Sequence, residues 1–207
     1  MRGLLVDFGG VLTTNVFDSF RAFCVAEGID PDEVRRLFRH EPAALRLVRG
    51  LETGAVTEAE FDERFGALLG VGHERRRGLV ERMFDHVEAD DEMVEAVRRA
   101  RAQGIRTGLI SNSMGTDRYD RSTFPELFDG VVISGDEGVH KPQPAIFHLG
   151  ADRVGLPPDQ CVFVDDLREN CEGAAAVGMT PVLHRGAAYT LPRLEELLGV
   201  QLRSPPG

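Results

Sequence analysis

Short apolar runs and longer amphipathic stretches alternate along most of this 207-residue chain. Gly3-Leu4-Leu5-Val6 is a continuous apolar run of strand length, typical of a strand buried on both faces of a parallel sheet. Asp90 or Asp91 is expected to cap a helix that Gly104 ends. Four further strands are predicted at 105–110, 130–134, 161–165 and 181–183. Helices are predicted to alternate with them near 143–154, 168–177 and 191–198.

Residues 17–88 show a different pattern, in which apolar residues recur at helical spacing. Pro31 opens one helix, since proline is favoured in the first helical turn. Thr57 and Glu60 have the spacing of a capping box, a side-chain pair that closes a helix N-terminus, and Gly70 ends the helix that follows. The segment is therefore predicted to be almost wholly helical.

Strands that alternate with helices are joined by right-handed crossovers and form a parallel sheet. We therefore predict the α/β fold class, with a Rossmann-like parallel sheet core, helices on both faces and an inserted helical domain. In this scheme residues 1–16 and 89–207 form the α/β core, and residues 17–88 form the insertion after the first strand.

The composition is that of an ordinary globular protein, with 42% hydrophobic and 28% charged residues. A formal net charge of -10 argues against nucleic acid and anionic membrane surfaces as partners, because both require a basic face. No stretch has the length and apolarity of a membrane span, and the N-terminus has no signal-peptide pattern, so we expect a cytoplasmic protein. The three cysteines contain no C-x-x-C pair, which argues against a disulfide framework or a thiolate metal site, and Cys171 is expected to be a buried, inert thiol. The sequence assigns no oligomeric state.

Asp7 is the first candidate for chemistry, because a carboxylate ends the first apolar run and Gly9 and Gly10 follow it. In parallel α/β sheets the carboxyl ends of the strands lie on one edge, and ligands bind there. Glycines at that edge let the backbone approach a ligand closely. Asp7 is therefore the candidate nucleophile.

Other strand ends add complementary groups. One strand leads into Ser111 and Asn112, the loop after the next holds Lys141, and the following strand runs into Asp165-Asp166. Taken singly, such residues usually serve as caps, turn residues or solvated charges. Together at one edge, paired carboxylates require a cation, and hard oxygen ligands suit Mg²⁺. A metal, a hydroxyl and a lysine around a carboxylate fit a tetrahedral phosphoryl dianion, which the carboxylate attacks.

These segments resemble the four ordered motifs of haloacid dehalogenase-like hydrolases. The matching segments are Asp7-Phe8-Gly9-Gly10-Val11-Leu12, Leu109-Ile110-Ser111-Asn112, Lys141-Pro142 and Val164-Asp165-Asp166-x-x-x-Asn170. The helical segment 17–88 resembles the helical cap that this family inserts after its first strand. The most similar branch includes the phosphatase domain at the N-terminus of soluble epoxide hydrolases and small bacterial sugar-phosphatases.

The resemblance implies a role for each matching residue. Asp7 would be the nucleophile that forms a phosphoaspartyl intermediate, and it would also bind Mg²⁺. Ser111 and Lys141 would bind the transferring phosphoryl group, with help from the backbone or amide of Asn112. Direct ligation of Mg²⁺ would involve Asp166 and the backbone carbonyl of Gly9. Support for the metal or its waters would come from Asp165 and Asn170.

Gly9 is the departure from the family pattern. Phosphatases of the family usually place a second Asp there as general acid and base, a function worth roughly 10²–10⁴ in rate. Turnover is therefore expected to be slow unless another group substitutes.

Three functions compete. The first is a Mg²⁺-dependent phosphatase acting on a small phosphorylated metabolite, such as a sugar phosphate. The second is a non-enzymatic or residual-activity phosphate-binding protein, which Gly9 favours. The third is a 2-haloacid dehalogenase, whose first motif also lacks the second Asp. The pair Asp165-Asp166 argues against the third, since dehalogenases need no metal and replace these acids with small polar residues. The phosphatase is the preferred hypothesis.

Overall fold

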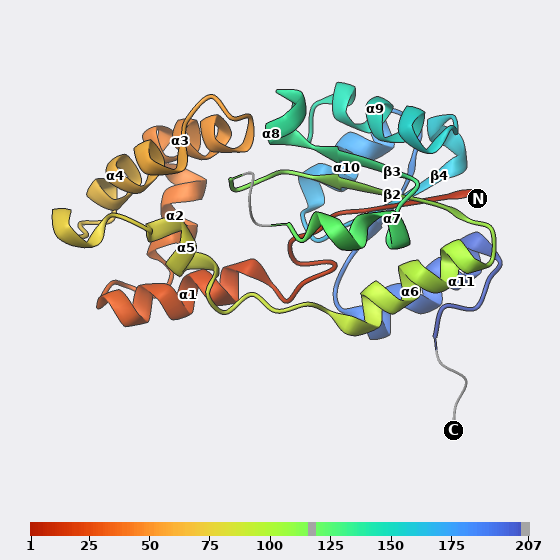
Figure 1. Cartoon of the computed structure of the whole chain (residues 1–207), viewed down its shortest axis with the longest axis horizontal. Coiled ribbons are helices and arrows are strands. Elements are labelled where there is room, and N and C mark those ends of the chain that lie inside the picture. Colours follow the sequence, from red (N-terminus) through yellow and green to blue (C-terminus); the bar gives the residue numbers. More distant parts are fainter. Residues whose placement is uncertain (116–118, 204–207) are drawn as a thin grey trace.

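Five parallel strands form a single sheet in the order β3-β2-β1-β4-β5, with β1 at its centre (Figure 1). The computed structural model describes residues 1–115 and 119–203. Gly3 of β1 lies opposite Arg106 of β2 on one side and Cys161 of β4 on the other. The strands are β1 (Gly3–Val6), β2 (Arg106–Ser111), β3 (Gly130–Ile133), β4 (Cys161–Asp165) and β5 (Thr180–Leu183). The predicted α/β class and parallel sheet are confirmed.

Helices cover both faces of the sheet, and each face has its own apolar cluster. On one face lie α6 (Asp91–Ala102), α7 (Phe124–Leu127) and α11 (Ala187–Leu198). On the other lie α8 (Ser134–Glu137), α9 (Pro144–Val154) and α10 (Arg168–Ala176). The side chains of Leu4 and Leu5, adjacent in β1, enter different clusters, as expected when successive residues of a strand face opposite ways.

Helix α11 begins four residues earlier than predicted, at Ala187 instead of residue 191. Pro192 lies inside this helix, although proline usually marks a helix start because it removes one backbone donor. Thr190 and Leu191, which precede it, are fully buried. Burial of this turn offsets the missing hydrogen bond, and the local sequence gives no sign of that packing.

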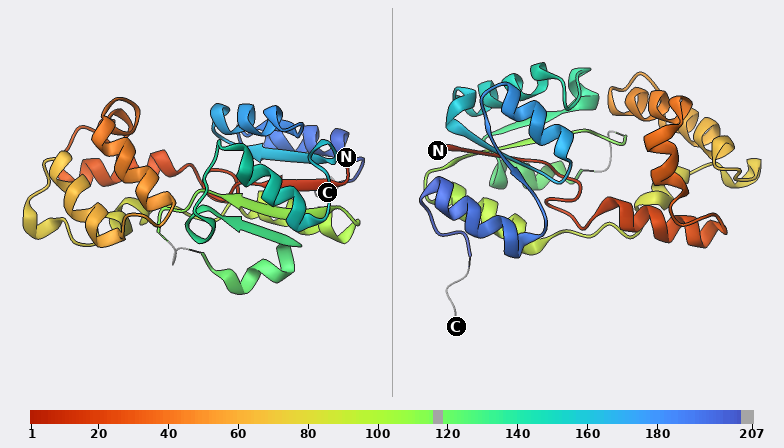
Figure 2. Two further views of the ribbon diagram at one scale, coloured as in Figure 1. Left: turned by 90° about the horizontal axis from the view of Figure 1, so that it is seen from above. Right: turned by 180° about the vertical axis from the view of Figure 1, so that it is seen from behind.

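A helical unit, residues 16–84, stands beyond the carboxyl ends of the strands (Figures 1 and 2). Its apolar cluster is separate from those of the sheet and includes Phe20, Phe61 and Phe65. The predicted capping box of Thr57 and Glu60 is present. The helices are α1 (Val16–Glu27), α2 (Glu33–His40), α3 (Pro42–Glu52), α4 (Glu58–Leu68) and α5 (Leu79–Phe84). Short 3₁₀ turns are η1 (His73–Arg75), η2 (Arg121–Thr123) and η3 (Pro158–Gln160).

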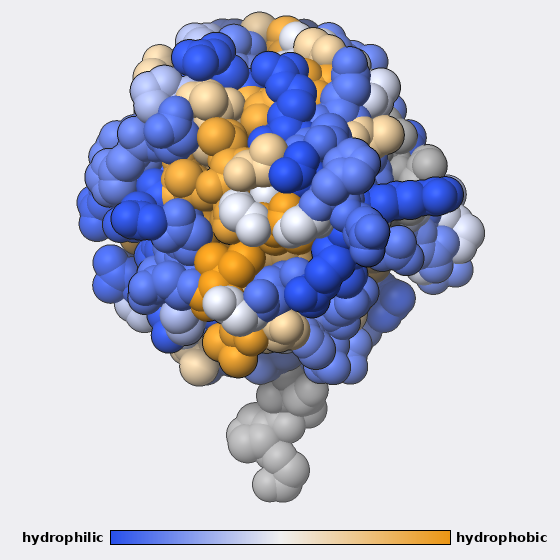
Figure 3. Space-filling view, turned by 90° about the vertical axis from the view of Figure 1, so that its left-hand side faces the viewer, coloured by the Kyte–Doolittle hydropathy of each residue, from blue (hydrophilic) through white to orange (hydrophobic). Residues whose placement is uncertain are grey.

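The two connections between the helical unit and the sheet run side by side. Thr13 and Ala89 form an antiparallel bridge, and the Thr14 amide donates to the Glu88 carbonyl at 2.8 Å. Seen from the helical end, hydrophilic residues surround a band of apolar ones (Figure 3). Among residues 1–115 and 119–203, no helix has both the length and the apolarity needed to cross a membrane.

Candidate active site

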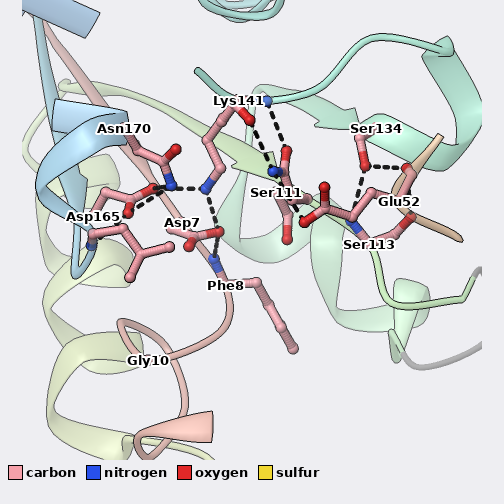
Figure 4. Close-up of polar contacts among 12 residues, drawn as sticks. Asp7, Phe8, Gly10, Glu52, Ser111, Ser113, Ser134, Lys141, Asp165 and Asn170 are labelled. Atoms are coloured by element: carbon pink, nitrogen blue, oxygen red, sulfur yellow. Dashed lines mark hydrogen bonds and ion pairs between the residues drawn. The ribbon is translucent and has the colours of Figure 1, made fainter. Parts of the chain in front are cut away.

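Asp7 lies at the end of the central strand, where the sheet edge faces the helical unit. Its amide donates to the Val164 carbonyl at 2.9 Å, and its carboxylate accepts from the Phe8 amide at 2.7 Å (Figure 4). The side chain is buried, and burial raises the pKa of Asp7 to about 7. Lys141 opposes that rise of the pKa, whereas the negative charge of Asp165 adds to it. Asp7 thus lies at the carboxyl edge of the sheet, and its role as nucleophile stays a prediction.

Lys141 bridges two carboxylates from different strands. Its ammonium Nζ lies 2.7 Å from Asp7 Oδ1 and 2.7 Å from Asp165 Oδ2 (Figure 4). Burial alone would lower the pKa of Lys141, but Asp165 and Asp7 together hold it above its ordinary value. A charge-assisted contact with both acids fixes the ammonium at the sheet edge. Lys141 is therefore a built component of the site and not a solvated surface charge.

Asp165 has its oxygens fully engaged by neighbouring donors. Besides Lys141, it accepts from Asn170 Nδ2 at 3.0 and 3.1 Å and from the Leu167 amide at 2.9 Å. The side chain has no solvent exposure. Asp165 and Asn170 thus hold Lys141 in place.

Asp166 extends toward the first loop instead. Burial, and then the charge of Asp165, raise the pKa of Asp166 to about 6. A Cβ on Gly10 would lie 2.6 Å from Asp166 Oδ2, and Gly10 has a φ of 76°, so glycine permits this close approach. Oxygens of Asp7, Asp165 and Asp166 all lie within 4.8 Å of one another. Such a set of hard oxygen donors fits a divalent cation such as Mg²⁺.

Ser111 is the last residue of β2 and Asn112 follows it, and their side chains have different partners. Ser111 Oγ lies 2.9 Å from the Tyr119 hydroxyl. Asn112 Oδ1 accepts from the Lys141 amide at 2.8 Å, and its Nδ2 donates to the Lys141 carbonyl at 3.2 Å. The side-chain amide of Asn112 therefore positions the loop that holds Lys141. Only the backbone of Asn112 is then left to bind a phosphoryl group, as one of the two predicted possibilities.

Two residues at the site were given no role by the sequence analysis. Glu52, at the end of α3, accepts from Asn112 Nδ2 at 3.3 Å, and burial raises the pKa of Glu52 to about 7. Tyr119 contacts Ser111, and burial raises the pKa of Tyr119 to about 12. Both lie outside the four motifs, in segments where only tertiary packing reveals their position.

A cleft of about 1490 Å³ separates the sheet edge from the helical unit. The candidate residues Asp7, Ser111, Lys141 and Asp166 line its sheet side. On its helical side the apolar lining residues include Phe17, Phe38, Leu45, Val48 and Phe84. Cationic side chains on that side are Arg35, Arg39 and Arg49.

Cys24, Cys161 and Cys171 are buried free thiols, and the burial predicted for Cys171 is confirmed. Burial raises the pKa of Cys171 to about 11, so its helix position does not activate it.

Comparison with known proteins places this geometry in context. Residues 1–178 match the haloacid dehalogenase-like hydrolase family. Acyl-CoA dehydrogenase family member 10 of Mus musculus is 34% identical over 97% of this chain and 19% of its own length. Bifunctional epoxide hydrolase 2 of Rattus norvegicus is 28% identical over 55% of this chain and 22% of its own length. The matched regions thus span about a fifth of these two relatives. Sesquiterpene phosphatase astK of Aspergillus oryzae is 23% identical over 72% of this chain and 77% of its own length.

Solved structures of low sequence identity share the fold. A predicted HAD-like family hydrolase of Porphyromonas gingivalis has a TM-score of 0.68 at 22% identity, over 97% of this chain and 99% of its own. The HAD family enzyme bt-2542 of Bacteroides thetaiotaomicron, in complex with magnesium and inorganic phosphate, has a TM-score of 0.64 at 20% identity. That match covers 90% of this chain and 96% of the other.

Proposed function

The chain belongs to the haloacid dehalogenase-like hydrolase family, and on that basis we propose that it is a Mg²⁺-dependent phosphatase. The reaction is hydrolysis of a small phosphate monoester through a phosphoaspartyl intermediate on Asp7. The observation that supports it most is the buried Lys141, 2.7 Å from both Asp7 and Asp165, beside the carboxylate of Asp166. A nucleophile, a phosphoryl-binding cation and metal ligands thus meet at one sheet edge.

The metal would be held by Asp7, Asp166 and the backbone carbonyl of Gly9, with Asp165 and Asn170 supporting it. The three clustered carboxylates fit this assignment, since Asp165 is occupied by Lys141 and Asn170 while Asp166 points to the first loop. When bound, Mg²⁺ would neutralise charge on the phosphoryl oxygens and on the paired acids. The phosphatase relative and the magnesium–phosphate complex of bt-2542 support this choice of chemistry.

The protein groups then have separate tasks. A carboxylate oxygen of Asp7 attacks phosphorus, and the bond from phosphorus to the leaving alcohol breaks. Lys141 neutralises the transferring group, and Ser111, oriented by the Tyr119 hydroxyl, donates a hydrogen bond to it. Water then releases phosphate from Asp7 and regenerates the free carboxylate.

The leaving group would lie against the helical unit, which we propose acts as a cap domain over residues 17–88, with 1–16 and 89–207 as the core. Phe17, Phe38 and Leu45 give that wall an apolar character, and the cleft of about 1490 Å³ has room for more than a triose. An organic alcohol with apolar surface is therefore favoured over a fully hydroxylated sugar.

The competing functions are less well supported. The acids Asp165 and Asp166 argue against a dehalogenase, which needs no metal and has small polar residues in place of these acids. A phosphate-binding protein without turnover remains the second candidate, because Gly9 provides no side chain for proton transfer.

A screen of the purified protein against a library of phosphate monoesters, with and without Mg²⁺, tests the proposal. Phosphate release should require Mg²⁺ and should fall at least about 10³-fold in Asp7→Asn, which retains the size of the side chain but not its nucleophilicity. Equal release by the wild type and Asp7→Asn would exclude Asp7 as the nucleophile. Mg²⁺-dependent phosphate binding without release would favour the binding protein.

A further inference from the structure

We propose that Glu52 of the helical unit is the general acid and base of this site, replacing the side chain that Gly9 lacks. The inference rests on the proposed phosphatase function and deepens it. It assigns a catalytic role to a residue that belongs to none of the four sequence motifs, and it predicts that the helical unit takes part in the chemistry as well as in covering the substrate.

The end of α3 is fixed to the core at Glu52. Its backbone carbonyl accepts hydrogen bonds from the hydroxyls of Ser113, at 3.3 Å, and Ser134 (Figure 4). Ser134 Oγ also accepts from the Ser113 amide at 2.9 Å. The backbone of the helical unit is thereby held against residues that follow β2 and β3. A side chain anchored in this way has a defined position relative to the sheet edge.

From this anchor the Glu52 carboxyl group extends toward the phosphoryl-binding residues. It accepts from Asn112 Nδ2 at 3.3 Å, and Asn112 in turn holds the backbone of Lys141 (Figure 4). Glu52 also lines the cleft. Asp7 attacks from the sheet edge, so the leaving oxygen departs on the opposite side of phosphorus, toward the helical unit. Glu52 belongs to that unit, at the end of α3.

The surroundings of Glu52 suit proton transfer. Burial raises the pKa of Glu52 to about 7, and the charge of Glu169 adds to the rise. Lys141, the hydrogen bond from Asn112 and the charge of Arg49 act in the opposite direction. An acid–base group is most effective when its pKa lies near the working pH, because both of its forms are then available. An ordinary exposed glutamate would be almost wholly ionised at neutral pH.

Other titratable groups of the cleft fit the task less well. Tyr119 is bonded to Ser111, and its pKa of about 12 keeps it protonated, so it cannot accept a proton from water at neutral pH. His140 Nδ1 lies 2.7 Å from the Lys141 carbonyl. Glu88 is an exposed side chain. Among the described carboxyl groups of the helical wall, Glu52 combines enclosure with contact to the phosphoryl-binding residues.

The proton balance closes over the two steps. In the first, the bond from Asp7 to phosphorus forms, the ester P–O bond breaks, and the carboxylic acid of Glu52 gives its proton to the leaving oxygen. In the second, the Glu52 carboxylate takes a proton from water as the water oxygen attacks phosphorus. The Asp7–phosphorus bond breaks, phosphate leaves, and Glu52 is again protonated.

Glu52→Gln is the decisive variant, because glutamine retains an acceptor oxygen for Asn112 and the same backbone carbonyl. We expect kcat for an alkyl phosphate to fall roughly 10²–10⁴-fold. For p-nitrophenyl phosphate, whose leaving group needs no proton, release of the first equivalent should remain fast while steady turnover slows. Glu74→Gln, a change of the same kind at an exposed carboxyl of the helical unit that does not line the cleft, should retain wild-type rates.

A rescue variant separates catalysis from structure. Adding Gly9→Asp to Glu52→Gln should restore part of the rate, since Gly9 has no positive φ and an added Cβ meets only Val16 Cγ1, at 3.3 Å. Wild-type rates in Glu52→Gln would overturn the proposal. The proposal would also be overturned if Glu52→Gln slowed phosphoenzyme formation and phosphoenzyme hydrolysis equally for alkyl and aryl phosphates. That result would indicate a purely structural role for Glu52. Failure of the wild type to form any phosphoenzyme would instead overturn the phosphatase assignment itself.

Discussion

The two walls of the cleft differ in how their residues are held and in what they bind. On the sheet wall, the buried Lys141 bridges Asp7 and Asp165, which lie at the ends of the adjacent strands β1 and β4. On the helical wall, apolar side chains such as Phe38 and Leu45 lie among arginines on separate helices. In the proposed function the sheet wall would carry out the reaction, and the helical wall would select the leaving group. Glu52 is the proposed exception, a residue of the helical wall that acts at the sheet edge.

Removal of Lys141 should change the sheet wall most. Lys141→Met deletes a desolvated cation facing the phosphoryl dianion and should weaken binding of orthophosphate or beryllium fluoride roughly 10²–10³-fold. It also leaves Asp7 and Asp165 without their shared partner and should destabilise the fold. Lys141→Arg retains the charge, and its affinity for these anions should lie between those of the wild type and Lys141→Met. A planar guanidinium cannot fully replace a compact ammonium.

Calorimetric titration with these anions, on protein shown to be folded by circular dichroism, measures the effect. Wild-type affinity in both folded variants would remove Lys141 from the phosphoryl site. If Lys141→Met does not fold, Lys141→Arg still gives the answer.

Asp166→Asn should increase the stability of the metal-free protein at neutral pH. The pKa of Asp166 is raised from 3.8 to about 6, so the folded protein binds the proton more tightly than the unfolded chain. Stability of the metal-free protein should therefore fall as pH rises from about 4 to 6, and it stays reduced above that window. At neutral pH the metal-free variant should be more stable than wild type by about 1–3 kcal/mol.

Urea unfolding with and without Mg²⁺ checks this result. Mg²⁺ should stabilise the wild type and leave Asp166→Asn unchanged, and the two proteins should converge below about pH 4. Equal Mg²⁺ stabilisation of both would show that Asp166 is not a ligand.

The helical wall should respond to a change of polarity with a smaller effect. Leu45→Gln preserves helix propensity and approximate size but removes apolar surface from the cleft. KM for a long-chain alkyl phosphate should rise about tenfold, while KM for glycerol phosphate stays the same. Leu68→Gln, on the exposed surface of α4, is the matched control. An equal change for both substrates would show that Leu45 does not contact the leaving group.

The sheet wall could be predicted from the sequence, and the helical wall could not. Asp7, Ser111 and Asp165 lie directly at strand ends, and the parallel topology brings strand ends together whatever the details of packing. The resemblance to haloacid dehalogenase-like hydrolases, including the epoxide hydrolase 2 proteins, is confirmed by the comparisons. The roles of the individual residues stay predictions.

Glu52 and Tyr119 received no role in the site from the sequence, for a physical reason. Glu52 contacts Asn112, sixty residues away along the chain, only because the end of α3 is bonded to Ser113 and Ser134. Nothing in the amphipathic pattern of α3 distinguishes a glutamate in such a place from a solvated one. The Asn112 amide is a similar case, since its partners in the Lys141 loop are set by tertiary structure.

A trapped covalent intermediate tests the central claim most directly. Wild-type protein is mixed with Mg²⁺ and an aryl phosphate, quenched in acid within milliseconds and measured by intact-protein and peptide mass spectrometry. The account predicts a gain of one phosphoryl group, located on Asp7 and absent from Asp7→Asn. Substrate turnover with no phosphorylated protein at any quench time, or with the phosphoryl group on another residue, would contradict it.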